Sequence, residues 1–175
     1  MSFWYFAYGS NMASATLRDR RGITYERAIP SRAVGWQLVV DKPPLVPIGE
    51  SFANIIPHDG SEVMGVAFKI AAADLDHIDL SEGVLIGNYE RITIVVEPLQ
   101  PNGSAPLQAF TLTSDRRDPS LHPSQRYMDL LITGALEHEL PAAYVAFLRT
   151  IPVVPEATAA IEFRSLVDQV LHRRS

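Results

Sequence analysis

The chain has 175 residues, of which 47% are hydrophobic and 20% charged, and it contains no cysteine. This composition suits one globular domain, residues 1–175, that buries a core without disulfides. Fifteen Lys and Arg against twenty Asp and Glu give a formal net charge of −5, a balance opposite to that of typical nucleic-acid-binding proteins. The lack of cysteine also excludes a thiolate nucleophile, an iron–sulfur cluster and Cys-ligated zinc.

Segments for export or membrane insertion are not indicated. No apolar run approaches the ~18 residues of a membrane-spanning helix. The N-terminal Met-Ser-Phe-Trp lacks the basic stretch of a secretory signal. We therefore expect a cytoplasmic protein with neither a membrane nor a nucleic acid as partner. Twofold assemblies are the commonest oligomers, and on that frequency alone a homodimer is the default expectation.

The first part of the chain has the composition of β-strands. Residues 3–8 are rich in aromatic side chains and end at Gly9, which predicts a buried strand and a tight turn. Strands are also predicted at 33–41 and 52–56, with a proline-rich stretch between them that cannot continue either one. Residues 62–70 are apolar on both alternating faces, which predicts a central strand buried on two sides.

Helical spacing follows at 72–81. Residues 91–97 and 107–113 are then predicted strands, and the Pro/Asn/Gly-rich loop between them is typical of a hairpin. The loop at 115–123 and the proline-rich 42–50 segment are candidates for a rim or lid, with plain surface loops as the alternative.

In the last part of the chain the apolar period becomes helical. One helix is predicted to bury a face composed of Tyr127, Leu130, Leu131, Gly134 and Ala135. Pro141 can start the next helix, whose shared face holds Tyr144, Val145 and Leu148. An amphipathic helix at 156–172 presents Ile161, Phe163, Leu166, Val167 and Val170. Because strands come first and helices last, the predicted class is α+β, with a mixed or antiparallel sheet that can curl into a barrel.

The first candidate site is the turn made by Tyr8, Gly9, Ser10 and Asn11. Gly9 allows a positive φ or the close approach of a ligand, and successive N–H groups at such a turn can bind an anion. The alternative is an ordinary strand-to-helix turn that Ser10 or Asn11 caps. The segment lacks the second glycine and the Lys-Ser/Thr of a P-loop. Ser10 does not lie in a G-x-S-x-G elbow, so support for a serine hydrolase is weak.

The second candidate is Glu82. Leu75, Ile78 and Glu82 stand at i, i+3 and i+7, which places the carboxylate on the helix face that packs on the core. Gly83 follows as a helix terminator, so Glu82 lies near the negative end of the helix dipole. Partial burial and the dipole both favour a protonated carboxyl, as suits a general acid or base near neutral pH. A helix-end glutamate turned into water is the alternative.

Tyr89 and Tyr127 are the third candidates, since each could bring a phenol hydroxyl to a pocket. A core tyrosine with one satisfied hydroxyl is the commoner arrangement. The five histidines show no metal-ligand spacing with one another or with carboxylates, so no metal site is expected.

Three segments together resemble the γ-glutamylcyclotransferase family: FAYGSNM at 6–12, DLSEGVLIGNY at 79–89, and PSQRYMDLLITGALEHELPAAYVAFL at 123–148. Their order and spacing match as well, and the resemblance extends from about residue 3 to about residue 150. It implies a mixed β-barrel flanked by helices. It also implies a reaction in which the α-amine of a small γ-glutamyl compound attacks its own γ-carbonyl. The products are 5-oxoproline and a free amine or amino acid, with no metal or organic cofactor.

By the same resemblance Glu82 is the catalytic acid/base, Tyr8–Asn11 bind the γ-glutamyl group through the backbone, and Tyr89 and Tyr127 line the pocket. The leaving group stays open, because γ-glutamyl amino acids, γ-glutamyl amines and carrier-bound γ-glutamyl groups present the same reacting atoms. Glutathione ranks lower among them. A non-catalytic ligand-binding module on the same fold is the alternative from a different class.

Overall fold

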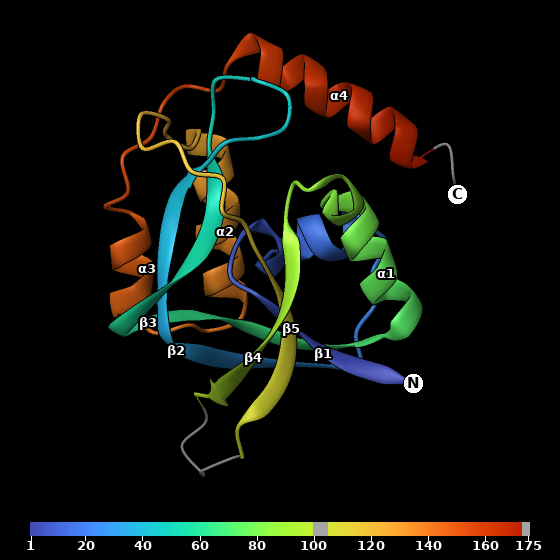
Figure 1. Ribbon diagram of the computed structural model, residues 1–175, viewed down its shortest axis with the longest axis vertical. Coiled ribbons are helices and arrows are strands. Elements are labelled where there is room, and N and C mark those ends of the chain that lie inside the picture. Colours follow the sequence, from blue (N-terminus) through green and yellow to red (C-terminus); the bar gives the residue numbers. More distant parts are fainter. Residues whose placement is uncertain (100–104, 173–175) are drawn as a thin grey trace.

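The computed structural model describes residues 1–99 and 105–172, without the side chains of residues 167, 168 and 170–172. Its five strands close into a barrel in the order β1-β3-β2-β4-β5 (Figure 1). The β1–β5 contact is parallel and the other pairings are antiparallel. The predicted α+β class with a mixed barrel is therefore confirmed. The strands are β1 (Ser2–Ala7), β2 (Arg27–Lys42), β3 (Phe52–Ala71), β4 (Glu90–Pro98) and β5 (Leu107–Thr113).

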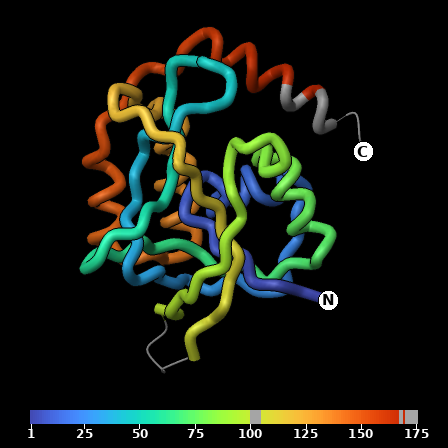
Figure 2. The backbone as a smooth tube through the Cα atoms, in the orientation of Figure 1, coloured from blue at the N-terminus to red at the C-terminus, as the bar shows by residue number. Residues whose placement is uncertain are grey.

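Helices flank the barrel on opposite sides. In Figure 1, α2 and α3 lie together on one side, α1 lies on the other, and α4 crosses the top of the barrel. The helices are α1 (Ala72–Ser81), α2 (Gln125–Glu137), α3 (Ala142–Leu148) and α4 (Thr158–His172), with single turns η1 (Ser10–Met12), η2 (Ala15–Arg20) and η3 (Val84–Ile86). Figure 2 shows the start of α4 beside the loop between β2 and β3, where the Ala157 amide donates to Glu50 Oε1 at 3.1 Å.

β3 corrects one sequence prediction, because the strands expected at 52–56 and 62–70 are one continuous strand. Pro57 pairs with Trp36, and the next pair in register is Glu62 with Val34. The intervening turn-forming residues bulge opposite Gly35, which has a φ of 81°. A bulge absorbs extra residues without ending the strand. β3 lies between β1 and β2, and its residues 63–68 are buried or half-buried on both faces, as predicted for 62–70.

α2 positions the turn at the end of β1. The helix begins after Ser124, whose hydroxyl accepts the amide of Tyr127, a standard N-cap. Its buried face matches the prediction except that Leu130 is half-buried and lines a pocket. Gly134 packs directly on η1, where an added Cβ would lie 2.6 Å from the Ala13 nitrogen. α2 and the η1 turn are therefore held in close backbone contact.

The structure confirms the predicted C-terminal helix but leaves most of its apolar residues exposed. The helix begins at Thr158 and buries Ala160, whereas Ile161, Phe163 and Leu166 are exposed. Helical spacing predicted the helix correctly but could not say whether a partner covers its face. Val167 and Val170, assigned to the same face, lie outside the described side chains.

Candidate active site

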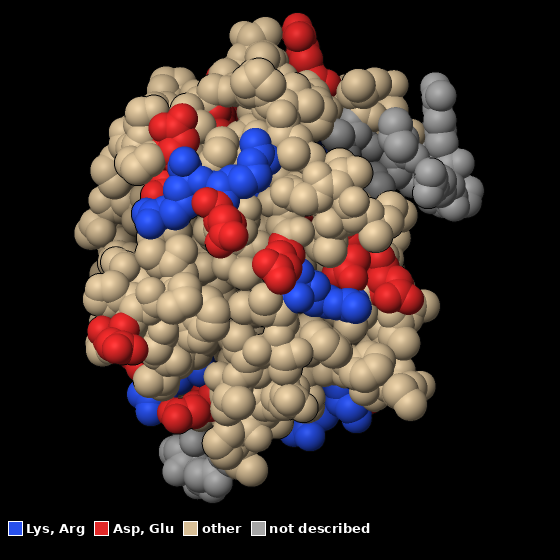
Figure 3. All heavy atoms as spheres, in the orientation of Figure 1, with Lys and Arg blue, Asp and Glu red and all other residues tan. Residues whose placement is uncertain are grey.

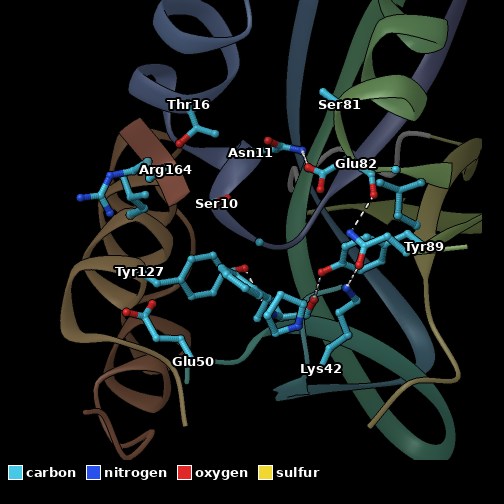
Figure 4. Close-up of a pocket in the computed structure, with 18 of the residues that line it drawn as sticks. Ser10, Asn11, Thr16, Lys42, Glu50, Ser81, Glu82, Tyr89, Tyr127 and Arg164 are labelled. Atoms are coloured by element: carbon cyan, nitrogen blue, oxygen red, sulfur yellow. Dashed lines mark hydrogen bonds between the residues drawn. The ribbon is translucent and has the colours of Figure 1, made fainter. Parts of the chain in front are cut away.

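A pocket of about 380 Å³ lies between the η1 turn, the end of α1, the loop after β2, and α4 (Figure 4). All seven sequence-predicted site residues line it, namely Tyr8, Gly9, Ser10, Asn11, Glu82, Tyr89 and Tyr127. They come from four segments that are far apart in the chain, and the barrel brings them together. Apolar side chains also line it, among them Leu45, Val46, Ile48, Ile86 and Phe163.

The turn at the end of β1 is shaped by close packing. Gly9 has a φ of −110°, so a left-handed conformation is not the reason for glycine here. An added Cβ would instead lie 3.3 Å from the Tyr127 hydroxyl. No side chain caps η1, which counts against the capped-turn alternative. The amides of Ser10 and Asn11 open the helical turn and so have no acceptor within it.

The Asn11 side chain reaches Glu82 rather than its own backbone. Its Nδ2 donates to the Tyr5 hydroxyl at 2.9 Å and to Glu82 Oε1 at 3.0 Å. Its Oδ1 is buried and has no hydrogen-bond partner among the described residues. The Asn11 amide therefore holds the carboxylate through its nitrogen, while its oxygen is buried without a described partner.

Glu82 follows α1 directly, and its side chain is only 18% exposed. Gly83, with a φ of 70°, ends the helix in the left-handed conformation that glycine allows. Glu82 Oε1 accepts from Asn11 and, at 2.6 Å, from Arg21 Nη2. Within the described part of the chain Oε2 has no hydrogen-bond partner. One carboxylate oxygen is therefore fixed while the other is available to a ligand.

Arg21 is a site residue that sequence reasoning missed. It follows η2, and it also donates to the Ser81 hydroxyl next to Glu82. Its guanidinium forms an ion pair with Glu82, a partner that the expectation from burial and the helix dipole did not include. No local signal could have found the pair, since its members are 61 residues apart.

Tyr89 and Tyr127 hold the backbone of Ala53 from two sides. The Tyr89 hydroxyl donates to the Ala53 carbonyl at 2.9 Å, and the Ala53 amide donates to the Tyr127 oxygen at 3.0 Å. Burial raises the pKa of both phenols, so both remain protonated at neutral pH. They form neutral, rigid walls of the pocket rather than bases.

The two candidate rim loops behave differently. Residues of the 42–50 segment line the pocket, whereas none of 115–123 does so among the residues described. The second loop instead supports the first from outside. Arg116 Nη2 donates to the Pro44 carbonyl at 3.1 Å, and the Ser51 amide donates to the His122 carbonyl at 3.1 Å. The expectation of a rim thus applies to the first loop alone.

Charges of both signs are mixed on the face shown in Figure 3, where basic side chains lie beside acidic ones. Ion pairs such as Arg91–Asp79, 2.7 Å apart, occur among the described residues. Because the net charge is −5, long-range attraction does not favour an anionic ligand, and its recognition would depend on groups inside the pocket.

The described side chains include no group of His, Asp and Glu that could hold a metal ion. No described helix is long and apolar enough to span a membrane.

Known proteins share both sequence and fold with this chain. Residues 62–148 match the model of the AIG2-like family. The chain is 35% identical over 164 residues to γ-glutamyl cyclotransferase aclK of Aspergillus oryzae, and this alignment covers 83% of this chain and 60% of that protein. It is 31% identical over 159 residues to the γ-glutamylcyclotransferase of Bos taurus, with 86% and 79% covered. A solved structure of a γ-glutamyl cyclotransferase superposes with a TM-score of 0.78 at 24% identity, covering 97% of this chain and 99% of that one.

The barrel and its helices define an α+β protein whose candidate site is a pocket that contains a carboxylate. The sequence similarity shows that the chain belongs to the γ-glutamylcyclotransferase family. It spans 60% of the length of aclK, and 79% of the bovine relative.

Proposed function

We propose that this chain is a γ-glutamylcyclotransferase that converts a small γ-glutamyl compound into 5-oxoproline and a free amine or amino acid. The observation that carries the proposal is the arrangement of Glu82. Asn11 and Arg21 hold its Oε1, and its Oε2 has no partner among the described residues. A fixed carboxylate with one available oxygen suits proton transfer to and from a bound substrate.

The reaction moves two protons from the attacking nitrogen to the leaving nitrogen. The substrate's α-ammonium first loses a proton to Glu82, and the resulting amine attacks the γ-carbonyl carbon. Glu82 gives this proton to the leaving nitrogen as the bond between that nitrogen and carbon breaks. The ring nitrogen then loses its second proton, which Glu82 passes to the released amine, so that a neutral lactam and an ammonium group result. Atoms and charge balance without water. The nucleophile and the electrophile belong to one molecule. The pocket therefore lowers the entropic part of the activation barrier by holding the bound substrate in its folded conformation.

The remaining pocket groups fit the substrate's polar atoms. The buried Oδ1 of Asn11 is an acceptor of the kind that an ammonium group needs. The amides that open η1 can donate to the α-carboxylate or to the developing oxyanion. The protonated phenols of Tyr89 and Tyr127 add no competing negative charge.

A substrate panel tests this proposal. The purified protein should release 5-oxoproline and the free amine in equal amounts from at least one of three groups: γ-glutamyl amino acids, γ-glutamyl amines, and glutathione. Binding of these compounds without product would instead assign the chain to the binding-module alternative. Glutamate as the product would make it a hydrolase.

Replacing Arg21 by methionine should lower kcat by about ten- to hundredfold. The variant removes the donor that holds Glu82 Oε1 at 2.6 Å, so the carboxylate is no longer fixed beside the bound substrate. The measurement is kcat and KM for a γ-glutamyl compound that the wild type converts. Arg27→Met removes an exposed charge at the start of β2 and should leave both values unchanged. A wild-type kcat in the Arg21 variant would show that the ion pair does not position the carboxylate.

A further inference from the structure

Lys42 is a buried cation in the pocket that the proposed reaction does not use. It ends β2, it is 1% exposed, and it lines the pocket. Its Nζ donates to Asn88 Oδ1 and lies 4.2 Å from the centroid of the Tyr89 ring. An ammonium group has three donors, so these contacts leave donor capacity facing the pocket.

The charge of Lys42 is not compensated by an ion pair. No carboxylate within the described part of the chain pairs with its Nζ. Two charges act on it, the carboxylate of Glu82 and a second cation, Arg116, whose Nη1 is buried without a hydrogen-bond partner among the described residues. Desolvated cations are costly unless they are paired. Two neighbouring cations of this kind favour an anion that is supplied from outside the chain.

The position of Lys42 separates it from the reacting end of the pocket. Figure 4 shows Asn11 and Glu82 at one end of the labelled group and Lys42 at the other. The Asn88 side chain lies between these ends, since its Nδ2 donates to the Glu82 carbonyl at 2.9 Å while its Oδ1 accepts from Lys42. The α-amine must be near Glu82, and the α-carboxylate shares its carbon atom. An anion at Lys42 therefore belongs to the far side of the scissile amide.

We infer that Lys42 is a specificity-determining residue whose ammonium binds a carboxylate on the leaving group of the substrate. The inference rests on the proposed cyclotransferase function. It assigns the space beneath the 43–50 loop to the released amino acid, with its carboxylate beside Lys42. The pocket then distinguishes leaving groups by charge, because an amine without a carboxylate cannot make this contact.

A matched pair of substrates tests this inference: γ-glutamyl-alanine and γ-glutamyl-ethylamide, which differ by the leaving-group carboxylate alone. The wild type should prefer the alanine compound, and Lys42→Met should lower the ratio of the two kcat/KM values about ten- to hundredfold, mainly through KM. Lys69→Met, which removes the other lysine from a surface pair with Glu26, should leave the ratio unchanged. Equal losses on both substrates would overturn the inference.

The pH dependence of the wild type gives a second readout. Burial, and next the charge of Arg116, lower the pKa of Lys42 to about 8, while the charge of Glu82 opposes them. The preference for γ-glutamyl-alanine should therefore fall as the pH rises through 8 and the ammonium is lost. Tyr89, the other ionisable group in contact with Lys42, has a raised pKa and stays neutral over this range. A preference that persists unchanged to pH 9.5 would contradict the inference.

Calorimetry separates this inference from the proposed function. Binding of the two compounds is measured in Glu82→Gln, which prevents turnover, with and without Lys42→Met. One outcome is Lys42-dependent, selective binding of γ-glutamyl-alanine together with a wild type that forms no 5-oxoproline. It would support a carboxylate contact of Lys42 and contradict the cyclotransferase function. Product formation without Lys42-dependent selectivity would support the function and contradict the contact. The Lys42 variant should fold. Lys42 carries a charged ammonium group below pH 8, burial of this charge costs free energy, and an uncharged methionine avoids that cost.

Discussion

Replacing Glu82 by glutamine is expected to lower kcat for 5-oxoproline formation by about 10³- to 10⁴-fold, the upper range for loss of a general acid/base. Glutamine has nearly the same shape, and its carbonyl oxygen can still accept from Asn11 and Arg21. What it cannot do is take a proton from the substrate's ammonium. Substrate binding should change much less than kcat, because the turn at Gly9–Asn11 is untouched.

The variant should still fold, although with lower stability than the wild type. The ion pair that it loses joins side chains that are 9% and 18% exposed, and leaving the Arg21 cation without its carboxylate costs about 1–3 kcal/mol. Asp76→Asn serves as the matched control, since it removes a carboxylate that is 83% exposed in the same helix. The control should keep full activity. If kcat of Glu82→Gln is then within about tenfold of the wild-type value, Glu82 is not the catalytic acid/base.

Gly134→Ala is expected to destabilise the fold by about 2 kcal/mol or more, although alanine is the better helix former. Helix propensity alone would favour alanine by about 1 kcal/mol. The new Cβ, however, would lie 2.6 Å from backbone atoms of Met12 and Ala13, and overpacking of this kind costs about 1–3 kcal/mol or more. Because the contact is with backbone, α2 and the η1 turn must move apart.

Denaturant unfolding measures this loss directly, and a fall in Tm of several degrees should accompany it. Activity should fall as well, since η1 carries Ser10 and Asn11 into the pocket. Thr133→Ala, at the exposed neighbouring position, should leave stability unchanged or slightly raised. A Gly134 variant as stable as the wild type would show that the close packing of α2 on η1 contributes little.

Local patterns predicted those features that depend on neighbours in sequence. The spacing of Leu75, Ile78 and Glu82 placed the carboxylate at the end of a helix whose other face residues are buried, and the structure has α1 ending at Ser81. The change of period after residue 123 located α2 and α3. In each case the relevant contacts lie within one or two helical turns.

Features that depend on distant contacts were not predictable in the same way. Arg21 contacts Glu82 across 61 residues of sequence, and Lys42, at the end of β2, donates to Asn88, which precedes β4. The composition of either short segment says nothing about such partners. β3 continues through Pro57 because β2 pairs with it on both sides of a bulge. The exposed apolar side of α4 likewise depends on what surrounds the helix rather than on its own spacing.

The most direct test of the central claim follows the atoms of the substrate. The protein is incubated with a γ-glutamyl amino acid that carries nitrogen-15 at its α-amine, in water enriched in oxygen-18, and the products are identified by mass spectrometry. Cyclisation at Glu82 predicts 5-oxoproline that retains nitrogen-15 and contains no oxygen-18, formed together with one equivalent of the free amino acid. Glutamate that carries oxygen-18 would contradict the account, because water and not the substrate's own amine would then be the nucleophile.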